Sequence, residues 1–242
     1  MRLITPWKYN LLAPLIPARI KPFLREWVMS RSVIRGFYPV PETPILGQVI
    51  KPEDTVIDIG ANIGAYSRVF AGLAQKVIAI EPVTPTFKIL LKSTADLKNV
   101  IPLKFALSDH EGPEYIRMLP ADETVGEISL FKSTLEPIWQ GNSSTDVKEE
   151  VTLRTLDSFH FKPNFIKCDC EGHDWKVIQG SDETTRKHRP IWLVEIMEYP
   201  LDSPIYKYFK KLKYKCFIQN GEGLRELYRE FSPTQNYFFV SQ

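Results

Sequence analysis

The chain has 242 residues, of which 43% are hydrophobic and 12% aromatic, so it can bury a full core and fits one large α/β domain with an appendage. Its 31 basic and 29 acidic residues give a formal net charge of +2 without a sustained basic block, so no nucleic-acid partner is expected. No uninterrupted apolar run approaches the roughly 20 residues of a membrane-spanning helix, and no transmembrane segment is predicted.

Residues 1–50 are punctuated by prolines, and one helix is predicted near residues 23–35, followed by a loop through the prolines of residues 39–44. This pattern indicates an N-terminal helical extension that packs as a cap on the rest of the chain. Its aromatic residues Trp7, Tyr9 and Trp27, with interspersed lysines and arginines, leave open a second interpretation, an arm that contacts a membrane surface peripherally or docks on a partner.

From residue 51 onward, apolar runs typical of strands alternate with helical periodicity. Strands are expected at 56–59, 77–80, 100–107, 151–156, 165–170, 190–196, 214–219 and 237–240, and helices up to about residue 73 and at 86–97, 173–180 and 205–212. Several strands are apolar on both faces, which predicts a largely parallel sheet covered on both sides by helices. We therefore assign residues 51–242 to one domain.

Residues 112–150 interrupt this alternation, with short strand candidates at 115–118 and 127–131 and a polar loop after them. So long an irregular stretch in a compact domain is usually a lid or a binding insertion. Its aromatic residues Tyr115, Phe131 and Trp139 could contact a ligand or serve ordinary packing.

The three cysteines Cys168, Cys170 and Cys216 are too few for a disulfide framework and lie in apolar strand-like runs. We interpret them as buried thiols of a cytoplasmic protein. Cys168 and Cys170 form a C-x-C pair, but without a second pair or a nearby histidine cluster a zinc site is not expected.

Residues 55–67 read TVIDIGANIGAYS, which predicts a strand, a tight glycine turn and a helix. Such a turn presents bare backbone N–H groups to a nucleoside or phosphate ligand. The dinucleotide fingerprint G-x-G-x-x-G fits poorly, because Asn62 and Ala65 occupy the second and third glycine positions counted from Gly60. The looser pattern G-x-G-x-G is met at Gly60 and Gly64, with Asn62 in the middle.

Six stretches together resemble the FkbM family of S-adenosylmethionine-dependent methyltransferases: VIDIGANIGAYS at 56–67, IAIEP at 78–82, FALSDHEG at 105–112, TLDSF at 155–159, IKCDCEGHDWKVIQG at 166–180 and RPIWLVEI at 189–196. One departure is Cys170, where the family usually has a hydrophobic residue. The resemblance implies a Rossmann-like class I methyltransferase fold, whose sheet has seven strands, mostly parallel, with one antiparallel strand near the C-terminus.

The resemblance also implies S-adenosylmethionine as the cofactor. Its methionine end would be held by Asp58, Gly60, Asn62 and Gly64, its ribose hydroxyls by Glu81, and its adenine edge by Ser108 and Asp109. A carboxylate at the position of Glu81 suits both hydroxyls of a ribose, whichever nucleoside cofactor carries it.

The candidate catalytic residues are Lys167, Asp169, Glu171 and His173. Residues two apart share one face of a strand, so Lys167 and Asp169 point the same way, with Glu171 just beyond the strand end. Either these charges form a buried ion pair, in which Glu195 could join, or Asp169 or Glu171 orients or deprotonates an acceptor while Lys167 positions that carboxylate. His173 suits proton transfer at neutral pH, or it only begins a helix. A divalent cation held by Asp169, Glu171 and His173 is conceivable, but the motif has too few oxygen ligands, and no metal is predicted.

The activity that the resemblance implies is O-methylation of a hydroxyl on a sugar or natural product, so the expected partner is a small-molecule or glycan acceptor. Two alternatives stay open. One is an NAD-dependent oxidoreductase, and the other is a non-catalytic cofactor-binding scaffold protein.

Overall fold

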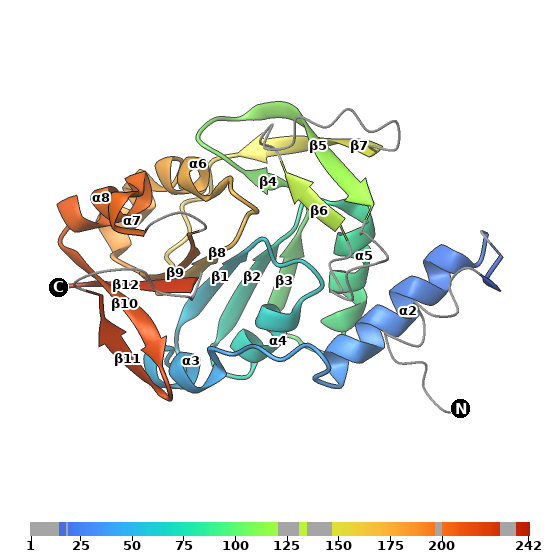
Figure 1. Ribbon diagram of the computed structural model, residues 1–242, viewed down its shortest axis with the longest axis horizontal. Coiled ribbons are helices and arrows are strands. Elements are labelled where there is room, and N and C mark those ends of the chain that lie inside the picture. Colours follow the sequence, from blue (N-terminus) through green and yellow to red (C-terminus); the bar gives the residue numbers. More distant parts are fainter. Residues whose placement is uncertain (1–14, 18, 121–130, 135–146, 197–199, 228–235) are drawn as a thin grey trace.

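The computed structural model describes residues 15–17, 19–120, 131–134, 147–196, 200–227 and 236–242. The short apolar runs of the sequence form a central sheet of eight strands (Figure 1): β1 (Thr55–Ile59), β2 (Lys76–Ile80), β3 (Val100–Leu103), β8 (Phe165–Cys168), β9 (Ile191–Glu195), β10 (Tyr214–Asn220), β11 (Gly223–Glu226) and β12 (Asn236–Ser241).

These strands lie in the order β11-β10-β12-β9-β8-β1-β2-β3. Strands β9, β8, β1, β2 and β3 run parallel to one another, whereas β12 is antiparallel to both of its neighbours, β9 and β10. The predicted class I arrangement with one antiparallel strand near the C-terminus is therefore confirmed. The predicted count of seven strands is wrong by one, because the chain after β10 turns back as β11 and adds an antiparallel edge strand.

Helices cover the sheet on both faces: α3 (Thr43–Val49), α4 (Ala65–Ala71) and α5 (Thr84–Ser93) on one, and α6 (Asp174–Gln179) and α8 (Pro204–Lys211) on the other. Successive residues of a strand point to opposite faces. Accordingly, Val56 of β1 packs in one core cluster with Ile45 of α3 and Phe70 of α4. The next residue, Ile57, packs in a second cluster with α6 and α8.

Two helices and one break were not predicted. Helix α3 begins where a proline-rich loop was expected, because Pro44 falls in its first turn, where a missing N–H is harmless. Helix α7 (Asp182–His188) follows α6 closely. The strand expected at 100–107 is divided between two sheets, since β3 ends at Leu103 and the chain resumes as β4 (Ala106–Leu107) elsewhere.

A second sheet lies at the top of the main sheet in Figure 1 and contains the region predicted as an insertion. It has the order β4-β7-β5-β6 and adds β5 (Gly112–Pro120), β6 (Phe131–Thr134) and β7 (Val147–Arg154). Tyr115 is exposed, and its hydroxyl donates to Glu150 at 3.1 Å. The strand candidate at 127–131 lies almost entirely outside the described residues, as do Trp139 and the side chain of Phe131. The role of this region as a lid stays a prediction.

Helix α2 (Lys21–Ile34) packs against α5, as expected of a cap. Val28, Met29 and Val33 form a buried cluster with Ile63 and Ile89. Of the three aromatic residues behind the interpretation as a membrane arm, Trp7 and Tyr9 lie outside the described residues, whereas Trp27 is partly buried and packs against this cluster. Within the part of the chain that is described, no helix is long and apolar enough to cross a membrane.

Candidate functional site

A pocket lies at the carboxyl ends of β1, β2 and β8, the edge at which parallel α/β sheets bind ligands. It contains about 700 Å³ of space, part of which is open solvent. Its walls come from the loop after β1, the end of β2, the approach to β4, the strand β5 and the loop after β8: Ile59, Gly60, Asn62, Ile80, Glu81, Pro82, Phe105, Ala106, Leu107, Ile116, Asp169, Cys170, Glu171 and His173.

The structure brings most of the predicted site residues to this one place. Six of them line the pocket: Gly60, Asn62, Glu81, Asp169, Glu171 and His173. Five others stand behind or beside the wall: Asp58, Gly64, Ser108, Asp109 and Lys167. Their predicted roles stay predictions, but the positions separate residues that can touch a ligand from residues that can act only through others.

The loop after β1 passes very close to the loop after β8. Gly60 has φ +70°, and a Cβ atom at this position would lie 1.9 Å from the backbone oxygen of Asp169. Only glycine fits there. Asn62 also adopts the left-handed region, with φ +50°, which asparagine tolerates better than most residues.

The expectation of bare N–H groups in this loop is wrong for the residues whose partners are known. The N–H groups of Gly60 and Ala61 both donate to the carbonyl of Ile80 at 3.0 Å. That of Gly64 donates to the carbonyl of Ala61 at 2.9 Å. The turn therefore uses these donors to bind itself to β2, and they are not available to the carboxylate of a ligand.

Glu81 is fixed on the pocket wall by two of its backbone neighbours. Its Oε2 accepts from the N–H of Asn62 at 3.0 Å, and its Oε1 accepts from the N–H of Val83 at 2.9 Å. The side chain is 5% exposed, and burial raises the pKa of Glu81 to about 7. A carboxylate has about four lone-pair sites, so each oxygen can still accept a hydrogen bond from a ligand.

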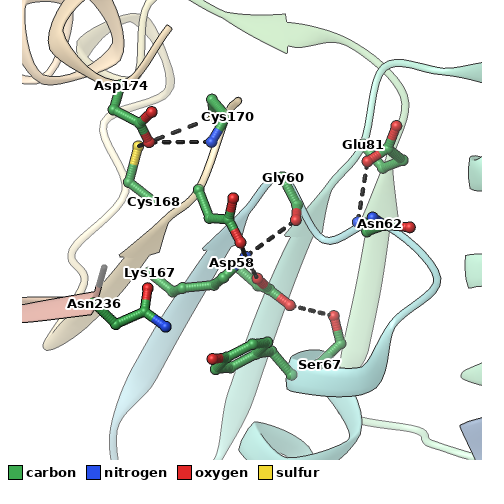
Figure 2. Close-up of polar contacts among 12 residues, drawn as sticks. Asp58, Gly60, Asn62, Ser67, Glu81, Lys167, Cys168, Cys170, Asp174 and Asn236 are labelled. Carbon is green, nitrogen blue, oxygen red and sulfur yellow. Dashed lines mark hydrogen bonds and ion pairs between the residues drawn. The ribbon is translucent and has the colours of Figure 1, made fainter. Parts of the chain in front are cut away.

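A buried group of charges lies beneath the Gly60 turn (Figure 2). The Nζ of Lys167 donates to the carbonyl of Gly60 at 3.1 Å and forms ion pairs with Asp169 at 3.2 Å and Asp58 at 3.7 Å. Asp58 is fully buried and also accepts from the hydroxyl of Ser67 at 2.6 Å. Burial raises the pKa of Asp58, whereas Lys167 and Ser67 lower it. The group therefore joins β1 to β8 and holds Asp169 at the pocket.

Lys167 and Asp169 confirm the ion-pair interpretation of the sequence, whereas the catalytic interpretation stays a prediction. They form the expected ion pair, and Asp169 still faces the pocket with a side chain that is 35% exposed. Glu195, at the end of β9, lies close enough to Asp169 for the two carboxyl groups to interact electrostatically. Burial, together with the charge of Asp169, raises the pKa of Glu195 to about 8. Carboxyl groups at the ends of two adjacent strands therefore meet beside the pocket.

The loop after β8 turns sharply before α6. Glu171 has φ +52° and Gly172 has φ +92°. Asp174 stabilises this turn, because its carboxylate accepts from the N–H groups of Cys170 at 3.0 Å and Gly172 at 3.3 Å. The turn places the side chains of Glu171 and His173 at the pocket wall.

His173 connects this loop to the predicted adenine side of the site. Its Nε2 lies 3.0 Å from the hydroxyl oxygen of Ser108, which is itself fully buried and 3.1 Å from Asp109 Oδ1. Asp109 is exposed and also pairs with His110 at 2.6 Å. Ser108 can therefore position His173, whereas Asp109 stands at the outer margin.

The residues that sequence reasoning missed are chiefly apolar. Phe105, Leu107 and Ile116 line the pocket, but nothing in their local sequence separates them from ordinary core residues. Asp174 was also missed, because a carboxylate at a helix start usually serves only as a cap. Among the described residues, three side chains lie close enough together to ligate one metal ion: Cys168, Cys170 and Asp174. The set considered from the sequence, Asp169, Glu171 and His173, does not.

Comparison with known proteins agrees with this geometry. The hexuronic acid methyltransferase AglP of Haloferax volcanii is 26% identical over 144 residues, covering 56% of this chain and 53% of that protein. This chain thus matches about half the length of that curated relative. The crystal structure of methyltransferase FkbM from Methylobacillus flagellatus superposes with a TM-score of 0.51 and 14% identity, over 92% of this chain and 60% of that one, and shows a shared fold.

A sequence profile of the methyltransferase FkbM domain matches residues 58–216. That range begins at Asp58 beneath the pocket, ends within β10, and includes every wall of the pocket. It covers more than half of the chain. The chain therefore belongs to the methyltransferase FkbM domain family.

Proposed function

We propose that this protein transfers the methyl group of S-adenosylmethionine to a hydroxyl group of a sugar or sugar-like natural product. The observation that carries the proposal is the pocket itself, where Glu81 faces the carboxyl groups of the β8 loop across one cavity. Family membership supports methyl transfer, and the printed name of the relative AglP, a hexuronic acid methyltransferase, supports a sugar acid as the acceptor.

The cofactor fits the donor set of the pocket in two respects. Glu81 supplies a carboxylate for the two ribose hydroxyls, and its pair of backbone hydrogen bonds keeps it in place. Phe105 and Leu107 supply an apolar wall for a purine ring. The sulfonium, when bound, supplies an already activated methyl group.

The protein must then align the acceptor hydroxyl and take up its proton as the oxygen attacks. Asp169 is the best placed base, because it faces the pocket while Lys167 holds its carboxylate from below at 3.2 Å. Glu171 and His173 stand on the same wall and can hydrogen-bond other hydroxyls of the acceptor. Glu195 acts through Asp169, and we assign it a positioning role.

The cofactor assignment is tested by calorimetry with S-adenosylhomocysteine and, separately, with NAD. We expect the sulfur nucleoside to bind and NAD not to bind. Glu81→Ala should weaken binding by about 1–3 kcal/mol through loss of charged hydrogen bonds. The matched control is Glu53→Ala, because Glu53 is an exposed carboxylate remote from the pocket. Binding of NAD alone would contradict the proposal in favour of an oxidoreductase.

The reaction is tested by transfer of a labelled methyl group to oligosaccharides that contain hexuronic acids. Asp169→Asn should reduce kcat on the order of 10²–10⁴-fold, the usual contribution of a general base, with little change in the affinity for S-adenosylhomocysteine. Asp202→Asn, at an exposed aspartate, is the control. If Asp169→Asn kept full turnover, another residue would be the base. If the wild-type chain bound the cofactor but methylated no hydroxyl, a scaffold role would be the better description.

A further inference from the structure

We propose that Cys168, Cys170 and Asp174 form a binding site for one thiophilic divalent cation, such as Zn²⁺, in the wall of the pocket. Figure 2 shows the three side chains converging from the end of β8 and the start of α6. Methyl transfer as proposed above needs none of the three as a reacting group, so the inference stands or falls independently of that function.

Two of the three separations between the ligand atoms are already close to those of a zinc site. The two sulfur atoms lie 4.0 Å apart, and the Sγ of Cys168 lies 3.3 Å from Asp174 Oδ1. Tetrahedral zinc with bonds of about 2.3 Å to sulfur and 2.0 Å to oxygen requires separations of about 3.8 Å and 3.5 Å. All three ligand atoms lie within 4.8 Å of one another. The separation between the Cys170 sulfur and the Asp174 carboxylate also lies within this limit, so an ion could bind after side-chain adjustments of up to about 1.3 Å.

The chemistry of the donors is also suitable. Without an ion, the thiol of Cys168 donates its proton to Asp174, so a proton occupies the direction that a cation would take. Binding would release one proton from each thiol to solvent, forming two metal–thiolate bonds and one metal–carboxylate bond without any change of oxidation state. Asp174 can keep its backbone hydrogen bonds meanwhile, since a carboxylate has spare lone pairs.

The site is reached from the pocket. Cys168 is fully buried, but Cys170 is partly exposed and lines the cavity, so a fourth ligand such as water can approach from that side. The ion would join the end of β8 to the start of α6 and so fix the loop that carries Asp169 and Glu171.

The test is a titration of the full, reduced, metal-free chain with Zn²⁺ alone by calorimetry, and with Cd²⁺ alone followed by the ultraviolet absorption of cadmium–thiolate bonds. We expect one ion per chain, with an absorption rise appropriate to two thiolates. Even partners outside the ligand shell are worth about 10–100-fold in metal affinity, so Cys170→Ser should cost at least about 100-fold. Cys216→Ser is the matched control, because Cys216 is a buried cysteine outside the cluster, and it should bind as the wild type does.

The proposal is overturned if the wild-type chain shows no saturable binding of one ion, or if a folded Cys170→Ser variant binds with unchanged affinity. Should that variant not fold by circular dichroism, alkylation of the wild-type chain decides. Zn²⁺ should slow the modification of Cys170, measured by mass spectrometry, and an unchanged rate would refute the site. Calorimetry with S-adenosylhomocysteine on the same samples separates this result from any failure of the proposed methyl transfer.

Discussion

Replacing Gly60 by alanine should be far more destabilising than a glycine-to-alanine change usually is. The added Cβ would lie 1.9 Å from the backbone oxygen of Asp169, whereas real Cβ atoms almost never approach other atoms more closely than 3.0 Å. The two segments would have to separate by about 1 Å. They cannot do so freely, because the N–H of Asp169 donates to the carbonyl of Ile59 and β1 pairs with β8 up to Cys168.

The loss of stability in Gly60→Ala has two components, and a second variant, Gly36→Ala, measures one of them separately. A non-glycine residue in the left-handed region costs about 1–2 kcal/mol. Gly36 has a similar φ of +73° but nothing within 4 Å of its added Cβ, so Gly36→Ala should cost only this amount. Gly60→Ala must also weaken two or three hydrogen bonds between β1 and β8, each worth about 0.5–1.5 kcal/mol. We expect a total loss of about 3–5 kcal/mol.

The measurement is urea denaturation of both variants, followed by circular dichroism, with calorimetry of S-adenosylhomocysteine on each folded sample. Gly60→Ala should lose about 2–3 kcal/mol more stability than Gly36→Ala and should also lose affinity, because both displaced loops form the pocket wall. If the two variants unfold within about 0.5 kcal/mol of each other, the close approach of the two loops is not a steric constraint, and the reasoning is refuted.

Three further changes have defined outcomes. Because the pKa of Glu81 is raised in the folded state from 4.5 to about 7, its contribution to stability is present below about 4.5 and is lost as the pH rises through about 7. Urea denaturation between about pH 4.5 and 7 should show this loss of stability in the wild type and a weaker dependence of stability on pH in Glu81→Gln. If both proteins showed the same dependence on pH, the raised pKa of Glu81 would be excluded. Lys167→Met removes the cation that pairs with the fully buried Asp58 and should cost about 3–5 kcal/mol of stability, whereas a cost below about 1 kcal/mol would show that the pair is unimportant. Phe209→Ala removes a fully buried ring that stacks on Phe239 at 4.3 Å and should cost about 3–5 kcal/mol in the same assay, and a much smaller loss would indicate that the core collapses into the space.

The predictions from the sequence were most accurate where a local pattern of residues is compatible with only one kind of secondary structure. The apolar runs of β1, β2, β8 and β9 are too short and too β-branched for helices, and they alternate with helical segments, so a parallel sheet covered on both faces follows. The alternation rule also placed Lys167 and Asp169 correctly on the side opposite Ile166 and Cys168, since the latter two pack in one core cluster whereas Lys167 and Asp169 form an ion pair. It failed at residues 100–107, because which sheet a short apolar run joins depends on partners that are distant in sequence.

Within the site, the sequence was enough to predict which residues stand at the carboxyl ends of the strands. Glu81 and Asp169 were identified in this way, because strand ends in a parallel sheet meet at one edge. Which polar groups face the pocket, and which form hydrogen bonds or ion pairs within the protein, depends on how the strands and loops pack together. Asp58 is buried beneath the wall, and the N–H groups of Gly60 and Ala61 serve the carbonyl of Ile80.

The same distinction explains the C-x-C pair. Its spacing alone did not indicate a metal site, because two cysteines on one strand provide only two ligands. The third donor, Asp174, lies six residues beyond Cys168, and it reaches the sulfur atoms only because the left-handed turn at Glu171 and Gly172 folds the start of α6 back over the end of β8. Turn geometry of this kind arises from packing against neighbouring segments, so the structure was needed to bring the three side chains together.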